Sequence, residues 1–123
     1  MNIRQAIEQV DLLTANQIPL EQKARWLSDL DGRVAGEVYA GRETVRDIPF
    51  SGYDADTDLE TGLLIPAPYD EVYRWWLEMK IQDVNGEIVR YNNEAQKYNL
   101  AMQDFMNYVT RTYPPVKRCR LTF

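Results

Sequence analysis

The first forty residues carry apolar side chains with the period of two amphipathic helices. Asn2 stands just before the first apolar set and can cap a helix, and Gln5 three residues later completes a capping box. Pro19 opens the second set. The spacing predicts helices over about residues 2–14 and 19–40. The apolar positions are Ile3, Ala6, Ile7, Val10 and Leu13 in the first helix, and Leu20, Ala24, Leu27, Leu30, Val34 and Val38 in the second.

This period does not continue through residues 41–67. The stretch contains Pro49 and several glycines, so it predicts a long irregular connection. Connections of this length in compact domains usually carry function or are mobile. The apolar run 63–65, between Gly62 and Pro66, predicts a short extended piece that packs the connection against the helices.

The strongest pattern lies in the C-terminal half, where apolar residues step alternately by four and three. Such a heptad seam is typical of a helix that packs along its length. Asn85 and Gly86 form a turn dipeptide inside the seam, but the seam keeps its phase through them. We therefore predict one long helix over residues 69–112, continuous or kinked, with an antiparallel pair broken at Asn85 as the alternative. The seam residues are Leu77, Ile81, Val84, Ile88, Tyr91, Ala95, Tyr98, Met102, Phe105 and Val109.

Two prolines end this helix, and residues 114–123 then alternate as in an extended strand. This tail has three basic residues and no acidic one, so its charge is +3 while residues 1–113 carry −8. A basic tail on an acidic body indicates attachment elsewhere. The sequence thus predicts one all-α domain over residues 1–113, a small helical bundle with one long C-terminal helix and a long irregular loop, followed by the extended tail.

Composition narrows the class of protein. The chain has 123 residues, the size of one ordinary domain, and 45% hydrophobic residues, which is typical of globular proteins. No apolar run approaches the roughly 20 residues of a membrane helix, and no export signal is apparent. The net charge of −5 makes nucleic acids and anionic membranes poor partners. These features predict a cytoplasmic protein that binds other proteins.

Catalytic chemistry finds little support in the sequence. There is no histidine, which removes the commonest general acid or base and the commonest transition-metal ligand. The lone Cys119 fits no metal or redox spacing. Asp70 and Glu71 are explained by the start of a helix, and no nucleophile or phosphate-loop motif is present. We predict no enzyme activity, no catalytic residue and no cofactor.

An acidic run in the connection resembles the start of a calcium loop. Its members, at alternate positions, are Asp54, Asp56, Asp58 and Glu60. The match ends there, because Leu59 stands where the loop needs glycine and Ile65 where it needs glutamate. We therefore favour a solvated acidic loop without a metal. An enzyme that uses this loop and a divalent metal is the weaker alternative.

Aromatic residues and the tail are candidates for contacts with other subunits. Two adjacent tryptophans on a helix cannot both be buried on one narrow face, so one of them meets a loop or another subunit. Rigid tyrosines are typical of interface hot spots, although packing inside the chain explains them equally well. The interaction candidates are Trp75, Trp76, Tyr91, Tyr98, Tyr108, Lys117, Arg118, Arg120, Leu121 and Phe123.

Two stretches of the chain also carry a family resemblance. They are residues 21–39, EQKARWLSDLDGRVAGEVY, and residues 68–99, PYDEVYRWWLEMKIQDVNGEIVRYNNEAQKYN, close to half of the chain together. These two stretches resemble the sequences of small helical proteins encoded among the head genes of tailed phages and prophages, of the head-tail connector (adaptor, head-completion) kind.

The resemblance implies a virion structural protein that is located in the host cytoplasm before assembly. Its partners would be portal, tail or neck proteins, its assembled state a homo-oligomeric ring, and it would need no cofactor. The acidic loop 54–60 would face the channel and repel passing DNA. The alternative is a cytoplasmic helical regulator or scaffold that acts as a dimer along the seam 77–109.

Overall fold

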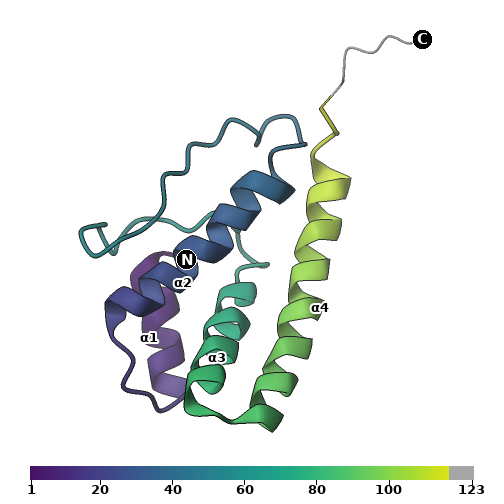
Figure 1. Cartoon of the computed structure of the whole chain (residues 1–123). Helices are drawn as coiled ribbons and strands as arrows, with labels where there is room; N and C mark the ends of the chain where they lie inside the picture. The colour runs from purple at the N-terminus through teal and green to yellow at the C-terminus, as the bar shows by residue number, and fades with distance from the viewer. Residues whose placement is uncertain (117–123) are drawn as a thin grey trace.

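Residues 1–116 fold into four α-helices and one π-helical segment. The computed structural model describes residues 1–116, and within them the elements are α1 (Ile3–Leu13), α2 (Leu20–Arg33), the π-helix η1 (Val34–Val38), α3 (Glu71–Asn85) and α4 (Ile88–Thr112). Helix α3 contacts α1, α2 and α4, and α4 runs alongside it (Figure 1). The predicted all-α class is confirmed.

The N-terminal helices begin where the sequence predicts. The capping box of α1 is present, because the amide of Gln5 donates to Asn2 Oδ1 at 2.8 Å and Asn2 N donates to Gln5 Oε1 at 2.9 Å. Helix α2 starts after Pro19 and continues into η1. The second predicted helix is therefore confirmed, but its last five residues widen from α to π geometry.

The C-terminal half is a helical hairpin, so the prediction of one helix across residues 69–112 is wrong and the antiparallel alternative is correct. Gly86 ends α3 in the left-handed conformation at φ +75°. The amide of Glu87 then donates to the Gln82 carbonyl at 3.0 Å, which closes the last turn. The seam keeps its phase across the turn because both helices direct an apolar face at the same core.

Replacing Gly86 with alanine should lower the free energy of unfolding by about 1–2 kcal/mol, because a Cβ is unfavourable in the left-handed region. A Cβ at this position would meet no atom within 4 Å, so the conformation alone causes the loss. Gly36→Ala is the matched control, since Gly36 also has open space but lies in η1. That change should be neutral or stabilising by up to about 1 kcal/mol. Urea unfolding followed by circular dichroism measures both, and equal losses would contradict the prediction.

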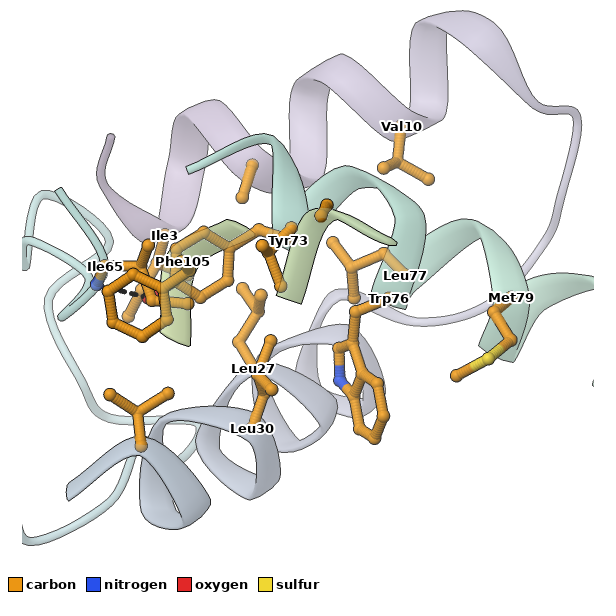
Figure 2. Packing of buried hydrophobic residues seen from close by; sticks show 14 of the residues in the cluster. Ile3, Val10, Leu27, Leu30, Ile65, Tyr73, Trp76, Leu77, Met79 and Phe105 are labelled. Atoms are coloured by element: carbon orange, nitrogen blue, oxygen red, sulfur yellow. Dashed lines mark hydrogen bonds between the residues drawn. The ribbon is translucent and has the colours of Figure 1, made fainter. Parts of the chain in front are cut away.

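The core draws side chains from every α-helix and from the connection (Figure 2). It includes Ile3 and Val10 of α1, Leu27 and Leu30 of α2, Tyr73 and Leu77 of α3, and Phe105 of α4. Ile65 is completely buried among them, which confirms that the run 63–65 packs the connection against the helices. Helix α4 buries only Ala101, Phe105 and Val109, so its first half contributes no fully buried residue.

The connection between η1 and α3 is held to both ends of the N-terminal region. Gly62 forms an antiparallel bridge with Asn2, and the amide of Leu63 donates to the Met1 carbonyl at 3.0 Å. The Tyr39 hydroxyl donates to the Leu64 carbonyl at 3.0 Å. The connection is therefore part of the packed structure. None of the helices within residues 1–116 is both long enough and apolar enough to cross a lipid bilayer.

Candidate protein-interaction site

The two adjacent tryptophans of α3 have different environments. Trp76 is buried, its indole Nε1 donates to the Trp26 carbonyl at 2.7 Å, and its ring lies 5.2 Å from that of Tyr98. Trp75 is half-buried, with the Arg74 guanidinium 4.2 Å and the Lys97 ammonium 4.7 Å from its ring centroid. Cation–π contacts of this kind cover an aromatic face. Trp76 is therefore a core residue, and Trp75 is the member of the pair that remains near solvent.

The three tyrosine candidates pack inside the chain. Tyr98 lies on Trp76, and burial raises the pKa of its hydroxyl. Tyr108 stacks on Tyr69 with ring centroids 4.6 Å apart. Tyr91 is half-buried and lines a small cavity at the turn between α3 and α4. Each tyrosine thus has neighbours within its own chain, which is the packing explanation left open by the sequence.

The acidic loop divides into exposed turn residues and one ion-pair partner. Asp54, Asp56 and Asp58 are exposed, and Asp54 Oδ1 accepts from the Asp56 amide at 2.9 Å. Glu60 pairs instead with Arg4 at 2.7 Å. Within residues 1–116, no group of three or more Cys, Asp or Glu side chains is arranged to hold a metal ion. The acids therefore act as local turn and helix-end contacts.

The tail candidates Lys117, Arg118, Arg120, Leu121 and Phe123 lie outside the described residues. The segment leading to them is extended and pairs with the start of the connection. Pro115 forms an antiparallel bridge with Arg42, and the amide of Val116 donates to the Gly41 carbonyl at 2.9 Å. The direction in which the chain leaves α4 is therefore fixed up to residue 116.

A buried carboxylate joins the connection to two helices, and the sequence did not single it out. Asp31 is fully buried; its Oδ1 accepts from the Tyr73 hydroxyl at 2.6 Å, and its Oδ2 accepts from the Tyr53 hydroxyl at 2.5 Å. The Leu64 amide donates to Oδ2 at 3.1 Å. Burial raises the pKa of Asp31, and these hydrogen bonds oppose that shift. The carboxylate is fully engaged within the chain, so we regard it as a structural tie.

A second acidic cluster lies where α1, α3 and α4 meet. The Thr14 hydroxyl donates to Glu78 Oε1 at 2.9 Å, and Arg74 Nε lies 3.3 Å from Glu78 Oε2. Burial and the neighbouring Glu78 raise the pKa of Glu94 on α4. Paired carboxyl groups can serve acid–base chemistry, but here one partner is occupied by the hydroxyl and the guanidinium. We therefore regard the cluster as a structural contact between these helices.

The most distinctive surface is one end of the bundle, formed by the turn after α1 and the turn between α3 and α4 (Figure 1). Six of the nine exposed large apolar side chains within residues 1–116 belong to these helix ends. We call this set the apolar end: Leu12, Leu13, Leu20, Val84, Ile88 and Val89. Leu12 is 88% exposed, and Ile88 and Val89 are each 74% exposed. Several exposed apolar side chains at neighbouring helix ends are typical of a site of protein contact.

A groove opens at the apolar end. It has a volume of about 570 Å³ and lies between the α1–α2 connection and the last turn of α3. Ile18, Pro19, Trp26 and Val84 supply its apolar lining, and Asp83 contributes an acidic group. The groove could not be predicted from the sequence, because its residues come from positions 17–26 and 80–84, which no single periodic pattern connects.

Comparisons with models of protein families, with curated proteins and with solved structures found no match to this chain.

Proposed function

We propose that this protein is a structural subunit of a phage or prophage head-tail connector, which assembles into a ring by contacts between protein subunits. The resemblance of residues 21–39 and 68–99 to connector proteins suggests the class. These residues form α2 with η1, and α3 with the first half of α4. The observation that carries the proposal is the apolar end.

The apolar end favours assembly for an energetic reason. Burying one large aliphatic side chain contributes about 1.5–3 kcal/mol, so covering six of them supplies enough free energy for a specific contact. Ring subunits need such a surface, because each subunit meets its neighbours through two different patches. The absence of histidine and the closed hydrogen bonding of Asp31 agree with a structural role.

The dimeric regulator is the weaker alternative. It relied on the seam 77–109 as a contact between two chains. In this fold the buried seam residues of α3 and α4 face each other within one chain, and only the seam positions near the turn, such as Val84 and Ile88, are strongly exposed. The seam therefore no longer supports a dimer over its length.

Native mass spectrometry and negative-stain electron microscopy of the full chain test the proposal. We expect closed oligomers larger than a dimer, either at high concentration or after addition of the portal protein from the same genome. The double substitution Ile88→Lys with Val89→Lys should weaken association at least tenfold, about 1.4 kcal/mol, because it places two charges in the contact.

The matched control is Leu100→Lys, a residue of α4 that is 70% exposed but lies away from the apolar end. It should leave assembly within twofold of the unmodified chain. A dimer that resists dilution and all these substitutions would support the regulator instead, and a chain that stays monomeric with and without portal protein would exclude the connector.

A further inference from the structure

The groove at the apolar end has the size and chemistry of a peptide site. Its volume of about 570 Å³ falls within the roughly 300–1,000 Å³ typical of sites that enclose a small ligand. Trp26 and Val84 supply apolar walls, and Val84 is 60% exposed in the isolated chain. Such a groove accepts apolar side chains that are presented from an extended backbone.

The tail of this same protein carries a matching pattern. In residues 117–123, KRCRLTF, apolar residues stand at every second position, at Cys119, Leu121 and Phe123. An extended segment directs alternate side chains to one side, so these three would enter a groove together while Arg118 and Arg120 point away from it.

The tail cannot reach the groove of its own chain. Helix α4 has 25 residues, which corresponds to about 37 Å at 1.5 Å per residue. The groove lies beside the turn that precedes α4, whereas residues 113–116, after which the tail begins, follow the other end of α4 (Figure 1). Seven extended residues span at most about 25 Å. A contact between residues 117–123 and the groove must therefore join two copies.

Charge favours the same pairing. The tail contributes three of the basic residues, and residues 1–116 carry eleven basic and nineteen acidic side chains, a net charge of −8. Asp83 lines the groove and the exposed Glu87 follows it in the turn. The ammonium of Lys80, which also lines the groove, lies 4.6 Å from the centroid of the Trp76 ring. A basic segment is thus attracted to an acidic body.

We propose that residues 117–123 of one copy bind the groove of the next copy, with Leu121 and Phe123 against Trp26 and Val84. This inference rests on the proposed function, because it names the contact that would link subunits of the ring. The contact is head-to-tail: each chain offers a groove at one end and a tail at the other. Heterologous contacts of this kind close into rings when the rotation between subunits permits.

Disulfide crosslinking of the full chain tests the contact, because Cys119 is the only cysteine. In the Val84→Cys variant each chain carries one thiol in the groove and one in the tail. Mild oxidation should then give a ladder of covalent oligomers beyond the dimer on a non-reducing gel, with bonds between residues 84 and 119 identified by mass spectrometry. The unmodified chain can form covalent dimers at most.

Leu100→Cys is the control, since it supplies a second exposed thiol on α4 outside the groove. Its ladder should be at least tenfold weaker at the same protein concentration. An equally strong ladder from Leu100→Cys, or no ladder from Val84→Cys, would overturn the proposed contact.

Complementation gives a second test that does not depend on disulfide chemistry. A groove variant, Val84→Lys, and a tail variant, Leu121→Asp with Phe123→Asp, should each remain monomeric. Mixed together, they should form a 1:1 dimer, because one supplies an intact tail and the other an intact groove. Rings that persist in both variants would overturn the tail contact and leave the connector function standing. Failure of the unmodified chain to assemble, alone and with portal protein, would remove both.

Discussion

Replacing Asp31 with alanine should lower the free energy of unfolding by about 3–5 kcal/mol, the usual cost of removing one partner from a buried charged network. The change leaves the hydroxyls of Tyr53 and Tyr73 and the Leu64 amide without their acceptor. Each orphaned buried group costs about 1–3 kcal/mol. Domains of this size have a total stability of about 5–15 kcal/mol, so the variant should be close to unfolding at 37 °C. Urea denaturation monitored by circular dichroism and tryptophan fluorescence measures the loss.

Two further variants separate the effect of breaking this hydrogen-bond network on stability from the effect of removing a negative charge. Asp29→Ala, on the exposed side of α2, should change stability by no more than about 0.5 kcal/mol. Asp31→Asn keeps the volume but exchanges an acceptor for a donor, and it should cost about 1–3 kcal/mol. A loss below 1 kcal/mol for Asp31→Ala would show that the connection is held by its other contacts.

The raised pKa of Asp31 also predicts that the stability of the chain depends on pH. Because burial raises the folded-state pKa of Asp31 above its ordinary 3.8, the folded chain binds the proton more tightly than the unfolded chain. The contribution of this group to stability is therefore complete below about pH 3.8 and declines as pH rises through the folded-state pKa. The stability difference between the unmodified chain and Asp31→Asn should narrow over that range. A difference that widens with pH would contradict the raised pKa.

Phe105→Ala should cost about 3–5 kcal/mol, the range found for large aromatic residues truncated in a core. Phe105 is fully buried and is one of three buried residues of α4. Its ring centroid lies 6.0 Å from that of Tyr39 and 6.4 Å from that of Tyr69, which flank the connection. The variant removes the buried side chain through which α4 contacts Tyr39, so α4 would be held mainly by α3 and by the stacking of Tyr108 on Tyr69.

Leu100→Ala is the matched control for Phe105, because it shortens an apolar side chain on the same helix that is 70% exposed. It should change the free energy of unfolding by no more than about 0.5 kcal/mol. Equal losses in the two variants would contradict the buried role assigned to Phe105. Both can be measured by thermal and urea denaturation of the same preparations.

Local sequence signals predicted most of the fold. Asn2 and Gln5 marked the start of α1, and the apolar spacing after Pro19 marked α2. These signals work because caps and periodicity are decided within a few residues. The turn at Gly86 was judged wrongly, because a heptad seam looks the same whether its helix continues or folds back on itself. The left-handed glycine, at φ +75°, decided the question, and sequence alone does not give φ.

The candidate site was harder to predict from the sequence than the fold was. Trp75 and Trp76 were expected to differ, and they do, but the sequence could not assign which one is buried. That assignment depends on Trp26, a residue of α2 fifty positions away. Nothing in the local sequence distinguishes Asp31 from Asp29, so the buried role of Asp31 could not be predicted. The apolar end could not be predicted, because Leu13 and Ile88 look like ordinary members of periodic patterns until the neighbouring helices are placed.

The partners of Asp31 have a consequence for how the chain is made. All of them follow it in the sequence, at residues 53, 64 and 73. While the ribosome is still synthesising α3, the carboxylate remains hydrated and the two N-terminal helices have no third helix to pack against. The α3–α4 hairpin is synthesised last, yet its contacts are the most local and should form quickly. We expect the nascent chain to reach its native state only after the α3–α4 hairpin has left the ribosome, when the early helices can pack against it.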